Sequence, residues 1–245
     1  MLPQETTETI LAYLASDLRT LRSCSQVCYS WYIAAVHSIH PVLTIITDDW
    51  SQRLSRHTPI QYMHKFGFLP LVKIVRIRSD SKGFSPKQFN RKYLELSNVQ
   101  RLEIDRLDIP SFTSKIGRYF SPFLPTLRAL YLKSPKGSVR QIIFFVGSFR
   151  HLEDLSLEGH KYYYFDIGPA EDLTLVPPFT PPLQGRLVVW NWEKEGLFRE
   201  MVRLFGGIGF RNMNLYNVAE MQLLLRACAK TLQMVQLHPT DPLGE

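Results

Sequence analysis

Hydrophobic residues recur along the chain in a three-position pattern, apolar-x-x-apolar-x-apolar, in which two polar or variable positions separate the first pair. The copies are Val72/Val75/Ile77, Val99/Leu102/Ile104, Leu127/Leu130/Leu132, Leu152/Leu155/Leu157, Phe210/Met213/Leu215 and Leu232/Val235/Leu237, with a looser copy at Leu183/Leu187/Val189. Successive first positions are 22 to 31 residues apart. Such a period predicts a repeat architecture in which neighbouring units stack to share one core.

Helix-like segments lie between these short apolar patterns, most clearly at residues 139–149, 193–205 and 218–232. The last segment places Met221, Leu224, Leu225 and Cys228 at i, i+3, i+4 and i+7, which is the stripe of an amphipathic helix. A strand followed by a helix in each unit predicts parallel strands with right-handed crossovers, wound into a curved solenoid whose concave face is the strand face.

The repeat pattern resembles the leucine-rich repeat, whose units are about 20 to 29 residues long. The Asn or Cys that usually follows the strand is replaced by Leu107, Pro135, His160 and Val218, which predicts irregular repeats without a side-chain ladder in the turns. The longest spacing contains residues 168–185, where five prolines exclude a helix and indicate an inserted loop.

The first 46 residues have a different pattern, typical of three short helices. The first helix carries Ile10, Leu11 and Leu14 on one side, and the second carries Leu18 and Leu21. The third, expected over about residues 25–38, is apolar on two faces: Val27, Cys28, Trp31 and Ala35 lie opposite Tyr29, Tyr32, Ile33 and Val36. A unit of about 45 residues is too small to bury both faces, so one should contact the repeats or another protein.

These helices resemble the F-box over residues 1–46. The matching positions are Leu2, Pro3, Glu5, Ile10, Leu11, Leu14, Leu21, Cys24, Val27, Cys28 and Trp31. The resemblance implies that this module binds a Skp-family adaptor, which links it to a cullin and a ubiquitin-conjugating enzyme, while residues 47–245 recruit the protein to be ubiquitinated. The combination with irregular leucine-rich repeats is similar to the F-box sets of mushroom-forming fungi.

The resemblance also implies which residues contact the adaptor. The expected adaptor-binding residues are Leu2, Pro3, Glu5, Ile10, Leu11, Leu14, Leu21, Val27, Cys28 and Trp31. Thr6 departs from the family, which commonly has Ile or Leu at this position, and this difference predicts a weaker adaptor contact.

Composition and the lack of certain motifs exclude several classes of function. No apolar run approaches the roughly 20 residues that span a bilayer, the N-terminus has no secretory signal pattern, and three cysteines do not suit a disulfide framework. We therefore expect a cytoplasmic or nuclear protein that needs no membrane. Cys24 and Cys28, with His37 and His40 nearby, are interpreted as core residues rather than metal ligands. No catalytic motif is present, so we expect neither an enzyme nor a cofactor.

Side chains that flank the central apolar residue of each strand should point away from the core, onto the concave face. The expected partner-binding residues are Arg76, Arg78, Arg101, Glu103, Tyr131, Lys133, Asp154, Ser156, Val188, Trp190, Asn212, Asn214, Tyr216 and Gln236. Residues 65–92 hold eight Lys or Arg and one acid within a chain of net charge +7. Arg76, Arg78 and Arg101 therefore form either a clamp for an acidic or phosphorylated segment or a solvated basic edge.

Three functions follow from these observations, in decreasing order of support. The first is a substrate receptor of a ubiquitin ligase, which binds the adaptor through the helices and an unknown protein through the repeats. The second is a non-catalytic interaction scaffold that retains the helical module for folding or for a different complex. The third is a nucleic-acid-binding protein that uses the basic stretch at residues 65–92.

Overall fold

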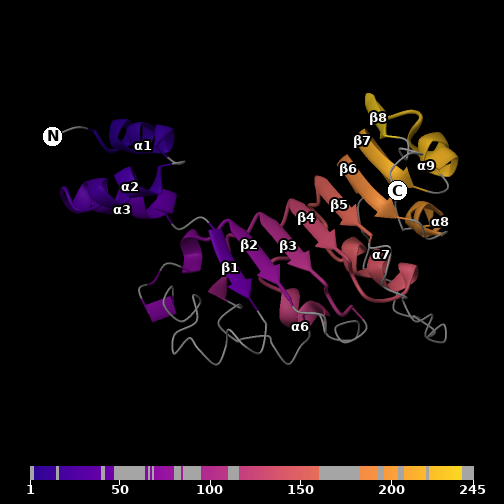
Figure 1. Ribbon diagram of the computed structural model, residues 1–245, viewed down its shortest axis with the longest axis horizontal. Helices are drawn as coiled ribbons and strands as arrows, with labels where there is room; N and C mark the ends of the chain where they lie inside the picture. Colours follow the sequence, from indigo (N-terminus) through magenta and orange to yellow (C-terminus); the bar gives the residue numbers. More distant parts are fainter. Residues whose placement is uncertain are drawn as a thin grey trace, which may run out of the picture.

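The computed structural model describes residues 3–14, 17–39, 42–46, 64–65, 67, 69–79, 84, 95–109, 116–159, 183–192, 196–203, 207–218 and 221–238. Within these residues the chain forms three N-terminal helices followed by a curved sheet of eight strands, with short helices along one side of the sheet (Figure 1). This arrangement confirms the predicted α/β architecture of a helical module followed by a long, all-parallel, solenoid-like sheet.

The helical module consists of α1 (Gln4–Tyr13), α2 (Leu18–Cys24) and α3 (Tyr29–Ile39). Asp17 caps α2, since its carboxylate accepts hydrogen bonds from the backbone N–H groups of Arg19 and Thr20. The module has its own small core, which contains Leu11, Leu21, Ala34 and Ala35 and is separate from the core of the sheet.

The third helix begins four residues later than the sequence pattern predicts. Backbone N–H groups of Gln26 and Val27 bond to carbonyls three residues earlier, which tightens the end of α2 into a turn. Cys24 therefore ends α2 while Cys28 precedes α3. Cys24 is half-buried, but Cys28 is exposed, so the interpretation of Cys28 as a core residue is wrong. Val27 and Cys28 lie in the connection rather than on a helix face.

The strands are β1 (Val42–Ile46), β2 (Ile74–Arg78), β3 (Arg101–Asp105), β4 (Ala129–Lys133), β5 (Asp154–Glu158), β6 (Leu183–Trp192), β7 (Ile208–Val218) and β8 (Met234–His238). They pair in sequence order, and every neighbouring pair is parallel. The central apolar residues of adjacent repeats are direct partners: Leu102 pairs with Leu130, and Leu130 with Leu155. The predicted repeats thus form strands in matching register.

One strand, β1, is absent from the predicted repeats. Leu43 and Ile45 are buried like the apolar residues of the other strands, but the position three residues before Leu43 is His40, so the three-residue pattern is incomplete. β1 pairs with β2 through Val42 and Ile74. The sheet therefore begins inside the stretch of residues 1–46 that the sequence assigns to the helical module.

The helices beside the sheet are η1 (Leu69–Leu71), α6 (Ile116–Phe120), α7 (Val139–Gly147), α8 (Leu197–Val202) and α9 (Met221–Cys228). Two of these helices are shorter than predicted. α8 extends from Leu197 to Val202 rather than over residues 193–205. α9 extends from Met221 to Cys228 rather than over residues 218–232, since Val218 still belongs to β7. Residues 168–182 of the predicted loop lie outside the described residues, whereas Leu183–Gly185 begin β6. Within the described part of the chain, no helix has the length and apolar character needed to cross a membrane.

A cluster of phenylalanines fills the core between the sheet and the helices. The ring of Phe145 lies edge-on to Phe120 at 5.1 Å and to Phe149 at 5.3 Å between centroids. Edge-to-face pairs stabilise by about 0.5–1.5 kcal/mol beyond the burial of apolar area. At the far end of the sheet burial is incomplete, since Leu237 in β8 is 50% exposed.

Backbone hydrogen bonds between repeats replace the side-chain ladder that the turns lack. The first N–H after β3, β4 and β5 donates to a carbonyl of the next repeat: Arg106 to Lys133 (2.8 Å), Ser134 to Glu158 (2.7 Å) and Gly159 to Trp190 (2.8 Å). Leu107 and Pro135, which replace the consensus Asn, are buried instead. Side chains also bridge the opposite ends of the strands, where Thr126 donates to the Val99 carbonyl and Asn98 to the Pro70 carbonyl, each at 2.8 Å.

Gly159 allows one of these close contacts between repeats. A Cβ atom added there would lie 2.2 Å from the carbonyl oxygen of Asn191, a backbone atom that cannot rotate away. We expect Gly159→Ala to lower the free energy of unfolding by about 1–3 kcal/mol, the usual cost of overpacking, measured as a lower urea midpoint.

Gly209→Ala is the matched control for this prediction. Its added Cβ would lie 3.5 Å from the flexible side chain of Thr231, an ordinary contact. The free energy of unfolding of this variant should lie within about 0.5 kcal/mol of that of the wild type. Equal urea midpoints for the two variants would contradict the close approach at Gly159.

Candidate partner-binding surfaces

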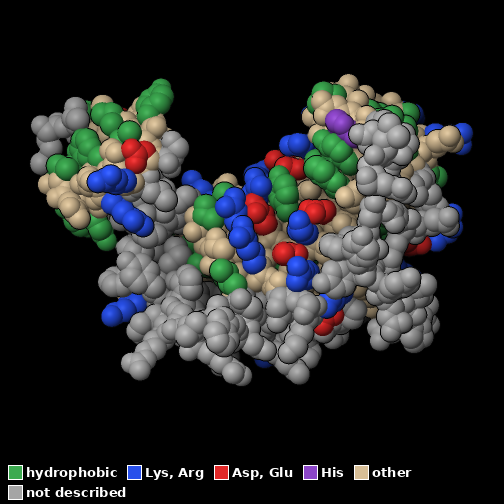
Figure 2. All heavy atoms as spheres, in the orientation of Figure 1, with side chains coloured by type: hydrophobic (Ala, Val, Ile, Leu, Met, Phe, Trp, Pro, Cys, Tyr) green, Lys and Arg blue, Asp and Glu red, His purple; other side chains and the backbone are tan. Residues whose placement is uncertain are grey.

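The outward side chains of the strands form one continuous surface, here called the open strand face (Figure 2). Buried and partly exposed positions alternate along β2, β3, β4 and β5, as side chains do in any strand that covers a core with one face. Because the strands are in register, residues at the same repeat position lie side by side in rows. One such row contains Arg76, Glu103 and Tyr131.

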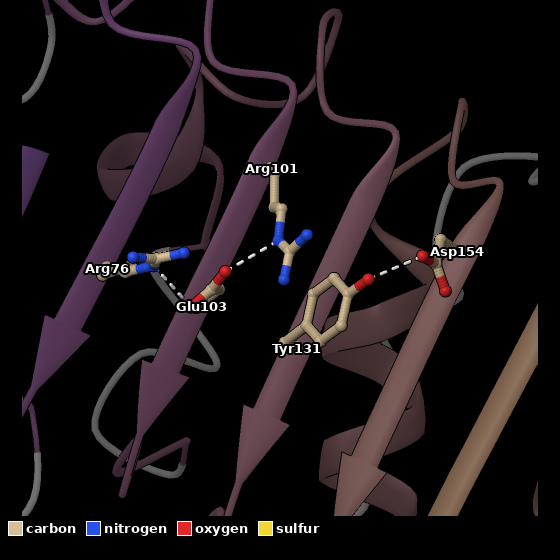
Figure 3. Close-up of polar contacts among 5 residues, drawn as sticks. All are labelled: Arg76, Arg101, Glu103, Tyr131 and Asp154. Carbon is tan, nitrogen blue, oxygen red and sulfur yellow. Dashed lines mark hydrogen bonds and ion pairs between the residues drawn. The ribbon is translucent and has the colours of Figure 1, made fainter. Parts of the chain in front are cut away.

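The first part of this face is a network of charged side chains (Figure 3). Arg76 Nε donates to Glu103 Oε2 at 2.9 Å, and Arg101 Nε forms an ion pair with Glu103 Oε1 at 2.7 Å. Two guanidiniums therefore share one carboxylate. Of the predicted clamp, the structure brings Arg76 and Arg101 together, but it places Glu103 of the same chain between them.

Tyr131 extends this network to the next strands. The guanidinium carbon of Arg101 lies 4.1 Å from the Tyr131 ring centre, and the Tyr131 hydroxyl donates to Asp154 Oδ2 at 2.6 Å (Figure 3). Burial raises the pKa of Tyr131 to about 12, with the hydrogen bond to Asp154 and the charge of Asp154 acting in the same direction. Five residues from four strands thus hold one another in a defined arrangement.

Charges of opposite sign also alternate at the ends of these strands. Lys133 Nζ lies 2.8 Å from Glu158 Oε1, and Arg106 Nε lies 3.7 Å from Asp105 Oδ1. Such exposed pairs typically contribute only about 0–1 kcal/mol to stability. These pairs therefore add little to the stability of the fold, and their charge pattern matters more for contact with a partner.

The second part of the open strand face, on β6, β7 and β8, is aromatic. The rings of Trp190 and Tyr216 stack at 4.5 Å with an angle of 12° between their planes, and those of Tyr216 and His238 stack at 4.0 Å with an angle of 5°. The sequence predicted that Trp190 and Tyr216 lie on this face. It did not predict that their rings stack or that His238 joins them. Each ring directly follows the last apolar residue of its three-residue repeat pattern (Val189, Leu215 or Leu237), and this shared repeat position was the available signal.

The helical module presents a different surface, formed by exposed apolar side chains. Tyr13 is 85% exposed, Tyr29 79% and Val27 65%. Among the predicted adaptor contacts, Pro3, Glu5, Ile10, Val27 and Cys28 are exposed, whereas Leu14 and Trp31 are half-buried. Leu2 lies outside the described residues.

Two predicted adaptor contacts need correction. Leu11 and Leu21 are fully buried in the core of the module, so in this structure they cannot touch a partner. They fill the space between the helices because they occupy the inward faces of α1 and α2. The expected adaptor contacts did not include the exposed Tyr13 or Tyr29, although the sequence placed Tyr29 on one of the two apolar faces of the third helix.

Comparison with known proteins identifies the module. Residues 1–40 match the family F-box-like. No curated protein and no solved structure matches the chain. The chain therefore contains an F-box-like domain at residues 1–40, followed by the all-parallel sheet that begins at Val42.

The raised pKa of Tyr131 makes part of the stability pH-dependent. The neutral phenol is favoured in the folded state, so its contribution is complete below a pH of about 10 and is lost as pH rises toward about 12. Tyr131→Phe should lower the free energy of unfolding by about 1 kcal/mol near neutral pH, and this deficit should shrink above about pH 10.

Urea midpoints measured between about pH 7 and about pH 11 test this prediction. Tyr13→Phe, which alters a phenol at the surface of α1, is the control and should match the wild type throughout. A deficit of Tyr131→Phe that stayed constant with pH would contradict the role of the Tyr131 hydroxyl.

Proposed function

We propose that this protein is a substrate-recruiting receptor subunit of a Skp-cullin-F-box ubiquitin ligase. The observation that carries the proposal is the F-box-like match at residues 1–40, on a helical module that keeps large apolar side chains at its surface. In this role the module binds a Skp-family adaptor, and through it a cullin, while the open strand face binds the target protein.

Adaptor binding is proposed because apolar side chains of the helical module are exposed. A module whose core contains two leucines and two alanines has little apolar surface to spare, yet Tyr13, Val27 and Tyr29 are each more than half exposed. Exposed apolar side chains grouped on one small module are typical of an interaction site. We assign Pro3, Glu5, Ile10, Val27 and Cys28 to direct contact with the adaptor, and Leu11 and Leu21 to the fold that presents them.

The target side rests on the open strand face. Its described residues combine arginines, paired carboxylates and stacked aromatic rings, and Tyr, Trp and Arg are the residues that most often dominate binding energy at protein interfaces. The proposed role is non-catalytic, because the chain brings two proteins together and the ubiquitin chemistry belongs to the partner enzymes.

The charge network argues against the nucleic-acid alternative. A phosphate-binding surface requires cations that are available to the backbone of the nucleic acid. On this face Arg76 and Arg101 share Glu103, and Lys133 is paired with Glu158. Carboxylates placed among the cations would repel phosphates, whereas they suit a protein partner of mixed charge.

Adaptor binding can be tested by co-expression with a Skp-family adaptor and a cullin, followed by affinity purification. The wild-type chain should retain both. Val27→Asp places a charge on an exposed apolar position and should lower adaptor recovery at least about tenfold, as the loss of a central interface contact does, while leaving the melting temperature unchanged.

Val42→Asp is the matched control, since it makes the same chemical change at a partly exposed valine of β1, on the sheet. It should not alter adaptor recovery. A wild-type chain that recovers no adaptor would refute the proposed function, and recovery of adaptor without cullin would favour the interaction scaffold.

A further inference from the structure

The last three strands differ in charge from the strands before them. β3 and β5 contain the acids Glu103, Asp105, Asp154 and Glu158. In contrast, β6, β7 and β8 contain Arg186, Arg211 and His238 but no Asp or Glu. The open strand face thus changes from a charge-balanced half to a half without carboxylates.

The stacked rings Trp190, Tyr216 and His238, together with Arg186, form what we call the ladder surface. Trp190 is 48% exposed, and His238 lies on the last described strand of the sheet. Because each ring covers the face of its neighbour, a partner meets mainly ring edges. Aromatic edges carry partial positive charge, and those of Trp, Tyr and His also bear N–H or O–H groups.

Arg186 adds a full positive charge to this surface. It lies on the same face of β6 as Trp190, four residues earlier, which corresponds to about 13 Å along a strand. Its register partners are Asp154 of β5 and Asn212 of β7. Among the residues that the structure describes, no carboxylate lies within ion-pair distance of Arg186, in contrast to Arg76 and Arg101.

We infer that the ladder surface binds an extended acidic segment of the target protein that also carries an aromatic side chain. The aromatic ring lies with its electron-rich face across the ring edges of Trp190 and Tyr216, and a carboxylate of the same segment pairs with Arg186. A segment with residues about 13 Å apart, four positions along an extended chain, reaches both. This inference rests on the proposed role of the open strand face in recruiting the target.

Charge complementarity favours the ladder surface over the arginines of β2 and β3. A carboxylate that approached Arg76 or Arg101 would also meet Glu103, which already occupies the space between them. On β6, β7 and β8 an acidic segment meets partial and full positive charges and no carboxylate. The acids in register on β5, Asp154 beside Arg186 and Glu158 beside Trp190, are already paired with Tyr131 and Lys133. The acidic partner expected from the sequence is thus reassigned to the other half of the face.

Three fluorescein-labelled peptides of about ten residues, long enough to span the distance along β6 between Arg186 and Trp190, test this inference on the full chain purified with its adaptor. The first carries a Glu and a Phe four positions apart, on the same side of an extended chain; the second replaces Phe with Ala, and the third replaces Glu with Lys. Fluorescence anisotropy should show that the first peptide binds at least about tenfold more tightly than either of the others.

Variants of the chain locate the binding. Trp190→Ala and Arg186→Glu should each weaken binding of the Glu-Phe peptide about tenfold or more, the effect of losing an interface hot spot. Tyr216→Phe keeps the ring and should retain affinity within about threefold. Arg203→Glu, an equally drastic charge change at an exposed arginine just after α8, is the control and should have no effect.

Two outcomes would overturn the inference: equal affinity for the three peptides, or Glu-Phe binding that survives both Trp190→Ala and Arg186→Glu. Circular dichroism of each variant shows whether lost binding reflects lost fold, and Arg186→Glu changes only an exposed side chain. Adaptor recovery from the same preparations separates the two proposals. Retained adaptor without peptide selectivity refutes the ladder site alone, whereas absent adaptor refutes the proposed function.

Discussion

Parallel pairing in matching register is the constraint on which the rest of this structure depends. Each strand buries a few apolar side chains, and no single repeat encloses enough apolar surface to be stable alone. Pairing Leu102 with Leu130 and Leu130 with Leu155 stacks these side chains into one continuous core. The phenylalanine cluster at Phe120, Phe145 and Phe149 closes that core from the helix side.

The same register creates the candidate binding surface. Because side chains alternate along a strand, aligning the buried residues also aligns the outward ones into rows across the sheet. Glu103 therefore lies beside Arg76 on one strand and Tyr131 on the other, and Trp190 beside Tyr216. Apart from the ion pair of Arg101 with Glu103 within β3, the contacts of the charge network and the aromatic stack join residues that are 20 or more positions apart in the chain.

The helical module follows a different physical logic. Its core of Leu11, Leu21, Ala34 and Ala35 is small and separate from that of the sheet, and its surface keeps apolar side chains such as Val27 and Tyr29. A module of this kind gains from a partner that covers those side chains. The chain thus has two separate cores and two different surfaces, exposed apolar side chains on the helical module and a polar and aromatic face on the sheet. Such a chain is suited to holding two proteins together.

The pattern of apolar and polar residues in the sequence determined much of the fold of this protein. The apolar spacing predicted β2 to β8, the parallel sheet and the outward position of residues such as Arg76 and Trp190, because strand alternation and helix periodicity are set by neighbours in sequence. It missed β1, because His40 stands at the first position of the three-residue pattern. The F-box resemblance placed Leu11 and Leu21 among the adaptor contacts, although both are buried. Only the tertiary structure decided that Glu103 separates Arg76 from Arg101, that Tyr131 reaches Asp154, and that three rings stack. Except for Arg101 with Glu103 on β3, those contacts join different repeats, so they depend on strand register and side-chain direction, which no local stretch of sequence specifies.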